Sequence, residues 1–300
     1  MNTIVTGALG ATEADLDALR ALGLEITLHP DERQPAAHPE QYEAAICNGL
    51  FLYNQIASFS NLKYIQLTSA GLDRVPMDYI RAHGIQIHNA QGVYRIPMAE
   101  FALWGVLELY KQGRFFAENQ RQHRWEKHRG LLELSGKTVC IVGCGSVGSE
   151  CARRFAAFGC RVLGIATKRR SQPFFESVLP LEALGDTLPK ADIVVLTLPL
   201  TQTTRGLFSD AVFAQMKAGS ILVNLARGPI VDQNALLRAL ETRLGGAVLD
   251  VFDTEPLPPD SPLWNLNNTI ITPHNSFVGE GNHERMMETV LQTFTSWRPK

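Results

Sequence analysis

One short segment near the middle of the chain constrains the fold more than any other. The apolar run 139–142 leads directly into a glycine-rich turn, a helical pattern continues to Phe158, and a second apolar run covers 161–165. The turn has the spacing GxGxxG, formed by Gly143, Cys144, Gly145, Ser146, Val147 and Gly148. A strand before such a turn and a helix after it are the context in which it binds a dinucleotide. We therefore expect a nucleotide-binding strand–helix–strand unit here, with a purely structural turn as the alternative.

Each glycine of this turn has its own physical reason. Gly143 permits a tight turn, and Gly148 allows the helix to pack closely on the strand. Gly145 lets the backbone approach a pyrophosphate, whose negative charge the N-terminus of the following helix favours. Ser146 and Val147 lie between these glycines, so we assign all of these positions except Cys144 to the cofactor site.

Bulk composition excludes several classes of protein. The 300 residues are 45% hydrophobic and 19% charged, which is ordinary for a water-soluble globular protein. A net charge of -2 gives no broad attraction for nucleic acid or an anionic membrane, and neither is expected as a partner. The first residues lack the basic and apolar segments of a signal peptide, and no apolar run approaches membrane-spanning length, so we expect a cytoplasmic protein.

The cysteine pattern does not suggest a disulfide framework. The chain has five cysteines, an odd number, and no pair has CxxC spacing. We interpret them as small buried residues of a reducing compartment, with metal binding or redox sensing as the alternatives. No metal ligands are assigned. The cysteines are Cys47, Cys140, Cys144, Cys151 and Cys160.

Short apolar runs alternate with helical patterns in both parts of the chain, which predicts an α/β fold with doubly wound parallel sheets. The first part has strand candidates at 3–6, 24–28, 44–47, 64–68 and 85–88, and Thr12 is placed to cap a helix through Leu22. The second part has six, at 138–142, 161–165, 193–196, 220–224, 246–249 and 269–271. Long helices are expected at 97–112 and 281–297.

The end of the strand 161–165 bears on the choice of cofactor. An NAD enzyme usually has an acidic residue here to accept a hydrogen bond from the ribose 2′-hydroxyl. This chain has none between Ala166 and Arg170, and instead places Thr167, Lys168 and Arg169 there. These residues suit a 2′-phosphate, so we favour NADP over NAD. A solvated basic turn is the alternative interpretation.

Three chemically active side chains follow three apolar runs in the last quarter of the sequence. Arg227, Glu255 and His274 each lie at or just beyond the expected carboxyl end of a strand. Open α/β sheets bind ligands at that edge. A guanidinium can hold an anion, while a carboxylate and an imidazole can hold and move a proton. Together with the nucleotide signal, the three residues point to redox chemistry.

Several motifs in a fixed order carry a family resemblance. The chain resembles the D-isomer-specific 2-hydroxyacid dehydrogenases, which include glyoxylate and hydroxypyruvate reductases and phosphoglycerate dehydrogenases. The resemblance spans nearly the whole chain, and the order of its motifs is far more specific than any one of them. The motifs are Ser69-Ala70-Gly71-Leu72-Asp73, Asn89-Ala90-Gln91-Gly92, Met98-Ala99-Glu100, the glycine-rich turn, Leu198-Pro199-Leu200-Thr201 and the segments around Arg227, Glu255 and His274.

The resemblance implies two Rossmann/flavodoxin-like domains. Residues 1–92 and 275–300 would form a flavodoxin-like substrate domain, into which a dinucleotide-binding Rossmann domain, 93–274, is inserted. This explains why the glycine-rich turn lies in mid-chain. The active site would lie in the cleft between the domains, and the long helix with the arm through Trp125 implies a homodimer.

The resemblance also implies roles on the substrate side. Arg227 would hold the carboxylate and keto oxygen of a 2-keto acid, with backbone N–H groups around Ala70 and Gly71 completing the carboxylate site. His274 would donate a proton to the keto oxygen as hydride arrives from the nicotinamide. Glu255 would bond to the other ring nitrogen and favour the charged imidazole.

On the cofactor side, the resemblance places Leu198 and Pro199 beside the dinucleotide. Asp250 would accept a hydrogen bond from the nicotinamide carboxamide, with a capping aspartate at a strand end as the alternative. A small 2-keto acid such as glyoxylate or hydroxypyruvate is the preferred substrate. The sequence pattern does not decide which residues select its substituent; the candidates are Asn48-Gly49-Leu50, Tyr53, Tyr94 and Arg95.

Two other functions fit the same motifs. One is NAD-linked oxidation of a D-2-hydroxy acid. The other is a dinucleotide-sensing binding protein like the transcriptional corepressors that resemble this family, which can retain all three residues. The present sequence lacks the disordered extensions through which such proteins bind partners, which favours the enzyme.

Overall fold

The computed structural model of the protein describes residues 1–297, which form two compact units. The first unit consists of Met1–Tyr94 together with the described residues from Gly279 onward, and the second is Arg95–Val278. The second is therefore inserted into the first, and its limits lie close to the expected domain limits at 93 and 274. No helix among the described residues is long and apolar enough to cross a membrane.

The first unit is built on a parallel sheet with the strand order β2-β1-β3-β4-β5. Its three central strands are almost entirely buried, as expected when helices cover both faces of a parallel sheet. All five expected strands are present, with ends shifted by one residue or not at all. They are β1 Asn2–Thr6, β2 Glu25–His29, β3 Ala44–Cys47, β4 Tyr64–Leu67 and β5 Gln86–His88.

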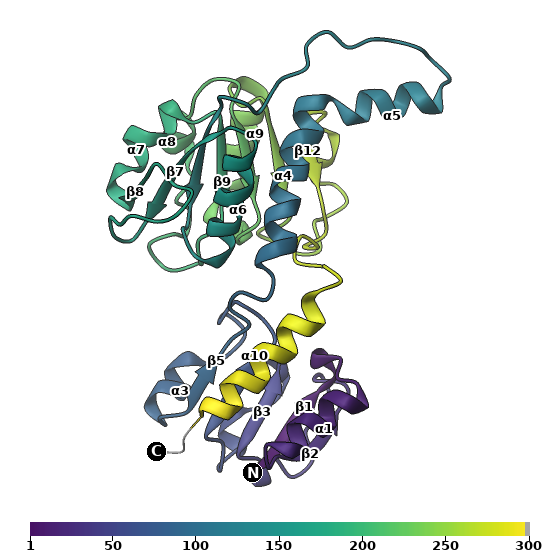
Figure 1. Ribbon diagram of the computed structural model, residues 1–300, viewed down its shortest axis with the longest axis vertical. Coiled ribbons are helices and arrows are strands. Elements are labelled where there is room, and N and C mark those ends of the chain that lie inside the picture. Colours follow the sequence, from purple (N-terminus) through teal and green to yellow (C-terminus); the bar gives the residue numbers. More distant parts are fainter. Residues whose placement is uncertain (298–300) are drawn as a thin grey trace. The chain divides into compact units, whose positions relative to one another are not determined.

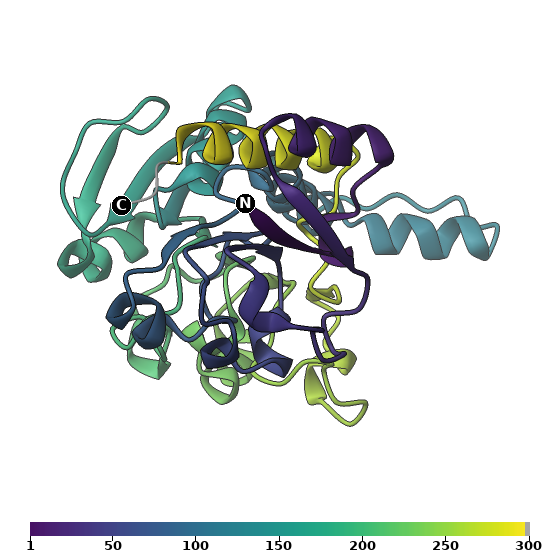
Figure 2. The ribbon, with the colours of Figure 1, turned by 90° about the horizontal axis from the view of Figure 1, so that it is seen from below.

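Four α-helices belong to this unit. The expected cap of the first one is confirmed, because the Thr12 side chain accepts from the backbone of Asp15 while the Asp15 side chain accepts from the backbone of Thr12. The last helix in the chain, α10, returns to this unit and lies beside α1, as Figure 2 shows. The helices are α1 Glu13–Ala21, α2 Leu50–Tyr53, α3 Met77–Ala82 and α10 Asn282–Ser296.

The second unit contains a seven-stranded parallel sheet with the order β12-β11-β10-β9-β6-β7-β8. The six strands expected from the sequence are all present, but the predicted number is wrong because the sheet has one more. The additional strand, β8, is short, has only one buried residue and ends in a proline at the edge of the sheet, so it lacks the apolar pattern of a buried strand. The strands are β6 Thr138–Val142, β7 Arg161–Ala166, β8 Ser177–Pro180, β9 Ile193–Leu196, β10 Ile221–Asn224, β11 Gly246–Leu249 and β12 Thr269–Ile271.

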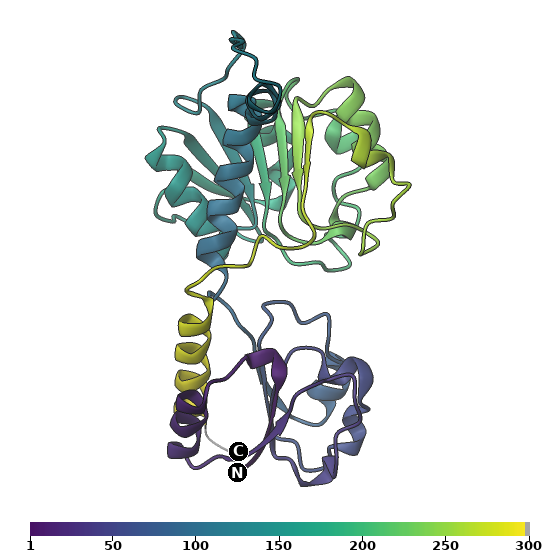
Figure 3. The same cartoon turned by 90° about the vertical axis from the view of Figure 1, so that its right-hand side faces the viewer.

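Helices cover both faces of this second sheet, as seen in Figure 3. One face packs against α4 and α6 through residues such as Val106 and Phe155, and the other against α7, α8 and α9 through residues such as Phe213 and Leu236. The helix α5 and the loop after it project away from the sheet (Figure 1). The helices are α4 Arg95–Lys111, α5 Gly113–Arg121, α6 Ser146–Ala157, α7 Leu184–Thr187, α8 Asp210–Phe213 and α9 Gln233–Thr242.

The strand order of the second sheet determines which loops are neighbours. The central strands β6 and β9 are adjacent, so the loops after them meet at the point where the winding of the sheet reverses. The strands β10, β11 and β12 are also adjacent and parallel, so their carboxyl ends lie at the same edge. The glycine-rich turn and the three candidate catalytic residues therefore belong to this one edge.

Candidate active site

The glycine-rich turn follows β6 directly and depends on glycine for its geometry. Gly143 has a φ of +106°, and a side chain there would place its Cβ 2.5 Å from the backbone nitrogen of Leu198. A Cβ on Gly148 would lie 2.1 Å from the carbonyl oxygen of Gly143. Contacts this short are not possible, so both positions require glycine. The close approach also places Leu198, and Pro199 after it, beside the turn, while their place beside the dinucleotide stays a prediction.

Gly145 has a different environment. A Cβ built on it would meet no protein atom within 4 Å, so packing within the protein does not require glycine there. The residue is the N-cap of α6, whose first N–H groups lie at the positive end of the helix dipole. A dinucleotide pyrophosphate that approaches the backbone closely would explain the glycine, so the turn fits the cofactor expected from the sequence.

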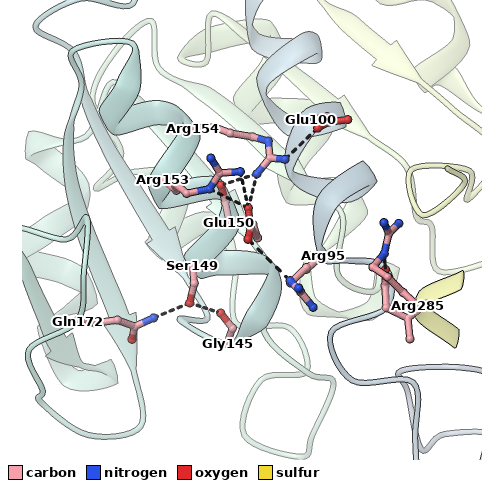
Figure 4. A network of polar contacts seen from close by, with 10 residues as sticks. Arg95, Glu100, Gly145, Ser149, Glu150, Arg153, Arg154, Gln172 and Arg285 are labelled. Carbon is pink, nitrogen blue, oxygen red and sulfur yellow. Dashed lines mark hydrogen bonds and ion pairs between the residues drawn. The ribbon is translucent and has the colours of Figure 1, made fainter. Parts of the chain in front are cut away.

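Side chains from beyond β7 hold this turn in place, as shown in part in Figure 4. Gln172 donates through Nε2 to Oγ of Ser149 at 2.6 Å, and Ser149 donates to the carbonyl of Gly145 at 2.7 Å. Arg170 donates through Nη2 to the carbonyl of Cys144 at 2.6 Å. These contacts could not be predicted from local patterns, because 26 residues separate Arg170 from Cys144 and 23 separate Gln172 from Ser149.

An ion-pair network, also drawn in Figure 4, joins α6 to α4. Glu150 pairs with Arg95, Arg153 and Arg154, and Arg154 also reaches Glu100 at 2.9 Å. Burial alone would raise the pKa of Glu150, but the hydrogen bonds and charges of the two α6 arginines more than offset this and lower it. The network fixes the helix whose N-terminus follows the glycine-rich turn.

The residues expected to bind a 2′-phosphate follow the carboxyl end of β7. Thr167, Lys168 and Arg169 are exposed, and none of the residues from 166 to 170 is acidic. The next residue, Arg170, is engaged by the glycine-rich turn and by Gln172. Lys168 and Arg169 are thus the two exposed cations at the end of β7, where the ribose of a dinucleotide would lie.

The three candidate catalytic residues come from three neighbouring strands. Arg227 follows β10, Glu255 follows β11 and His274 follows β12. The loops of Arg227 and Glu255 touch, because a Cβ on Gly228 would lie only 1.9 Å from the backbone carbon of Phe252. Glycine beside Arg227 is therefore what lets these two loops pack against each other.

Glu255 and His274 form the contact expected from the sequence. Nδ1 of His274 lies 2.8 Å from Oε2 of Glu255, and the backbone N–H of Phe252 donates to Oε1 of Glu255 at 3.0 Å. The carboxylate is thus held from both sides. Nδ1 facing Glu255 leaves Nε2 as the nitrogen that can exchange a proton with another molecule. About a third of each side chain is exposed, 34% for His274 and 37% for Glu255.

The backbone at His274 is unusual, and Asp250 stabilises it. His274 has a φ of +50°, and its N–H donates to the carbonyl oxygen of Asp250 at 2.8 Å. The Asp250 carboxylate accepts from the hydroxyl of Thr272 at 2.7 Å and from the N–H groups of Asn275 at 2.7 Å and Ser276 at 2.9 Å. Asp250 is completely buried. The loop that carries His274 is therefore anchored on both sides of the imidazole.

These hydrogen bonds agree with the alternative interpretation of Asp250 as a capping aspartate at a strand end. Its Oδ1 accepts two hydrogen bonds and its Oδ2 one, and the side chain is completely buried, so the contact with the nicotinamide carboxamide implied by the resemblance stays a prediction. The main structural partner of Asp250 is the His274 loop. Its partners lie 22 to 26 residues away, where sequence spacing gives no guide.

The expected carboxylate-binding backbone belongs to the loop after β4, in the first unit. The carbonyl of Ala70 accepts from Nδ2 of Asn89 at 2.6 Å, and that of Gly71 accepts from Oγ of Ser69 at 3.0 Å. These bonds orient the peptide groups of the loop. The roles of Ala70 and Gly71 in binding substrate stay predictions.

The cysteines have the environment of packed core residues. All five are buried and none forms a disulfide. Burial raises the pKa of Cys140 and Cys151 to about 12, and that of Cys144 and Cys160 to about 11, so their thiols are poor nucleophiles at neutral pH. Within residues 1–297, no three His, Cys, Asp or Glu side chains gather as a metal site would require.

The chain is similar in sequence to a known protein family and to individual members of it. Residues 103–276 match the family model described as "D-isomer specific 2-hydroxyacid dehydrogenase, NAD binding domain". The chain is 33% identical over 245 residues to a glyoxylate reductase of Korarchaeum cryptofilum, an alignment that covers 79% of this chain and 73% of that protein.

Solved structures with the same fold cover nearly the whole chain. A D-isomer specific 2-hydroxyacid dehydrogenase family protein of Aeromonas salmonicida superposes with a TM-score of 0.84 at 31% identity, covering 98% of this chain and 94% of that one. A D-isomer specific 2-hydroxyacid dehydrogenase of Xanthobacter autotrophicus, solved in complex with NADPH and MES, gives 0.79 at 28% identity, covering 98% and 95%.

Proposed function

Because the chain belongs to the D-isomer specific 2-hydroxyacid dehydrogenase family, we propose that it reduces a small 2-keto acid of the glyoxylate or hydroxypyruvate class. The family consists of NAD(P)-dependent oxidoreductases, so a nicotinamide dinucleotide is the cofactor. The similarity to a glyoxylate reductase supports this substrate class. The observation that carries the proposal is the Glu255–His274 pair, which is suited to proton transfer.

His274 is the proposed acid of the reduction. When bound, the reduced nicotinamide supplies the hydride to the keto carbon. The protonated imidazole gives its Nε2 proton to the keto oxygen, and the product is a 2-hydroxy acid. Glu255 holds Nδ1 at 2.8 Å and stabilises the positive charge of the imidazole before the proton leaves.

Arg227 is the proposed anchor of the substrate. It is partly buried, and its Nη1 donates to the carbonyl of Ala226 at 2.8 Å, which restrains the guanidinium. A planar guanidinium can donate to a carboxylate and to a keto oxygen together. Its place after β10, next to the loop that carries Glu255, supports this role. Backbone N–H groups of Ala70 and Gly71 are proposed as further donors to the carboxylate.

NADPH is the proposed cofactor. Thr167, Lys168 and Arg169 follow β7 without an acid among them, and Lys168 and Arg169 favour the extra phosphate of NADP. The related Xanthobacter autotrophicus enzyme was crystallised with NADPH, which is compatible with this choice. Gly143, Gly145, Ser146, Val147 and Gly148 are proposed to hold the pyrophosphate, with Leu198, Pro199 and Asp250 beside the rest of the cofactor.

One experiment tests the activity and the cofactor together. The purified protein is mixed with NADPH or NADH and with glyoxylate, hydroxypyruvate or pyruvate, while the absorbance of the reduced cofactor is followed. We expect turnover with a higher kcat/KM for NADPH. Tight dinucleotide binding without turnover of any acid would instead favour a sensor, and a higher kcat/KM with NADH would contradict the cofactor choice.

The anchor is tested in the same assay. Arg227→Ala should reduce kcat/KM for the keto acid by about a hundredfold or more, because a charged hydrogen-bonding partner is lost. NADPH affinity, measured by fluorescence titration without substrate, should be unchanged. Arg238→Ala, on the exposed face of α9, is a suitable control. Unchanged kinetics with the keto acid would refute the role of Arg227.

A further inference from the structure

The loop between β7 and β8 brings two polar side chains, Arg170 and Gln172, to the carbonyl groups of the glycine-rich turn. The carbonyl of Cys144 accepts from Nη2 of Arg170 at 2.6 Å and from Nε2 of Gln172 at 3.3 Å. Gln172 also reaches the carbonyl of Gly145 through the hydroxyl of Ser149, by contacts of 2.6 and 2.7 Å (Figure 4). The two side chains are themselves joined, because Nε of Arg170 donates to Oε1 of Gln172 at 2.9 Å. Two successive carbonyls of the turn are therefore held from one side.

Holding these carbonyls also fixes the direction of two N–H groups. A peptide group is planar and trans, so the carbonyl of Cys144 and the N–H of Gly145 point in opposite directions. The same is true of the carbonyl of Gly145 and the N–H of Ser146. Both N–H groups lie at the N-terminus of α6, where the first N–H groups of a helix have no partner within it and favour an anion. They are the donors that the proposed pyrophosphate would meet.

The edge strand β8 fixes the backbone of this loop. The N–H of Arg170 donates at 3.3 Å to the carbonyl of Val178, a buried residue of β8. The ring of Phe175 packs against β7 close to Cys144. A Cβ on Gly164 would lie 2.9 Å from that ring and 2.6 Å from Sγ of Cys144, so glycine makes room for both. The seventh strand, which the sequence did not predict, thus holds the loop beside the glycine-rich turn.

Charge alone does not account for this arrangement. Gln172 is neutral, so it cannot act by attracting a phosphate. Arg170 is charged, but its Nε and Nη2 are directed at Gln172 and at the turn. The two cations before it, Lys168 and Arg169, are the ones proposed to meet the 2′-phosphate. The geometry therefore separates two tasks within one loop, which are reading the ribose and shaping the turn.

We propose that Arg170 and Gln172 are positioning residues that hold the glycine-rich turn in the conformation that binds a pyrophosphate. They act equally on NADH and NADPH, because both cofactors contain this group, and Arg170 is not a ligand of the 2′-phosphate. The inference rests on the proposed place of the pyrophosphate at this turn, and it does not depend on the preference for NADPH.

The main test compares the two cofactors in wild type, Arg170→Ala and Gln172→Ala. Fluorescence titration without substrate gives the dissociation constants of NADH and NADPH. Each variant should weaken both cofactors by the same factor, about tenfold or more, because donors that are no longer aligned lose their hydrogen bonds to the charged pyrophosphate. At saturating cofactor, kcat should stay near that of wild type. A loss confined to NADPH, or unchanged affinity for both cofactors in the folded variants, would overturn the proposal.

Three further variants separate positioning from charge. Lys168→Ala should weaken NADPH alone. Arg170→Lys keeps the charge but cannot form the same fork of hydrogen bonds, so most of the loss seen with alanine should remain. Wild-type affinity for both cofactors in Arg170→Lys would show that charge is sufficient, against the proposal. Arg161→Ala is the matched control, because Arg161 begins β7 and pairs with Glu176 of the same loop at the other end of the strand. It should leave both dissociation constants unchanged.

Hydrogen exchange followed by mass spectrometry gives a readout without any cofactor. The N–H of Ser149 donates to the carbonyl of Gly145 at 2.9 Å in the first turn of α6. The peptide that contains Ser149 should exchange faster in Arg170→Ala and Gln172→Ala than in wild type or Arg161→Ala. Equal exchange in all four proteins would count against the proposal. Failure of the wild type to bind either dinucleotide would refute the proposed function, and the exchange rates would still decide whether the two side chains hold the turn.

Discussion

His274 is held in a backbone conformation that non-glycine residues seldom adopt. Its φ of +50° lies in the left-handed region, which costs roughly 1–2 kcal/mol for an L-residue. The hydrogen bonds from its loop to Asp250 offset this cost, and the contact with Glu255 orients the ring. Strain that neighbouring residues hold in place is common where a side chain must keep one orientation for function.

Proton donation in the proposed reaction depends on the imidazole of His274. His274→Ala should lower kcat for keto-acid reduction by about 10²–10⁴-fold, the usual contribution of a positioned acid, while NADPH binding changes little. Steady-state kinetics and fluorescence titration measure the two effects. Glu255→Gln should also lower kcat, because the amide carries no charge. The loss should be smaller than for His274→Ala, because the amide can still contact Nδ1.

The control for this prediction is another histidine. His83, just after α3, is exposed, and it contacts Tyr79 both through a hydrogen bond between its Nδ1 and the Tyr79 carbonyl and by stacking on the Tyr79 ring. His83→Ala should therefore behave like wild type. Reductase activity that survives His274→Ala undiminished would remove this residue from the proton-transfer step.

At the scale of elements, Asp250 connects the end of β11 with the loop after β12. Asp250→Ala would leave the N–H groups of Asn275 and Ser276 without their partner, at about 1–3 kcal/mol for each buried group. The loop should relax and His274 should leave its left-handed conformation. We expect kcat to fall at least about tenfold, together with a lower melting temperature.

Asp232→Ala provides the comparison for this change. Asp232 likewise accepts from two backbone N–H groups, those of Asn234 and Ala235, where it caps α9. Its loss should lower stability but leave kcat near that of wild type. If Asp250→Ala alters only the KM for NADPH and not kcat, its role is the carboxamide contact and not the positioning of His274.

The ion pairs between α4 and α6 should stabilise the folded protein to an extent that depends on pH. The pKa of Glu150 is lowered in the folded protein, so its contribution to stability is full above its unfolded pKa and is lost as the pH falls through the folded value. Glu150→Gln should therefore destabilise the protein by about 1–3 kcal/mol at neutral pH.

Urea denaturation at two pH values measures this effect. The difference between wild type and Glu150→Gln should shrink as the pH falls below the ordinary pKa of glutamate and through the lowered folded-state pKa of Glu150, where its carboxylate becomes protonated. Glu118→Gln on α5 removes an exposed pair with Arg121 and should have little effect. A difference that stays constant with pH would show that the charge of Glu150 does not stabilise the α4–α6 contact.

The elements also show what the sequence can and cannot predict. The Thr12 cap, the buried strands and the glycine-rich turn depend on neighbouring residues, so local patterns suffice to predict them. The strand β8 could not be predicted because only one of its four residues is buried, so it lacks the apolar pattern of a buried strand. The contacts of Gln172 and Asp250 cross 22 to 28 residues and depend on the strand order, which spacing alone does not give.

At the scale of the whole molecule, we expect a homodimer. Several large apolar side chains are exposed on α4, α5 and the loop after α5: Trp104, Phe116, Trp125, Leu131 and Leu132. Trp125 is 96% exposed, and its environment in a lone chain would be water. Leu132 is fixed to the end of α4 by a hydrogen bond from its N–H to the carbonyl of Tyr110. Such a set of exposed apolar groups is typical of an interface.

Light scattering coupled to gel filtration tests this expectation. The wild-type protein should elute with twice the mass of the 300-residue chain. Trp125→Asp combined with Leu132→Asp should give a monomer, because charges are strongly unfavourable in an apolar interface. Leu22→Asp, an exposed leucine in the first unit, should leave the dimer intact. A monomeric wild type would contradict the prediction.

The contacts around Asp250 have a consequence for protein engineering. Glu255, His274 and the groups that hydrogen-bond to them lie between Asp250 and Ser276, and the ring of the next residue, Phe277, packs edge-on against His274. The segment joins the sheet through the pairing of β11 with β12. This segment therefore carries most of the contacts that orient Glu255 and His274. It can be exchanged between relatives as a single piece without redesigning the acid, provided that the recipient has two adjacent parallel strands in the register of Leu249 with Ile271 and a glycine at the position of Gly228.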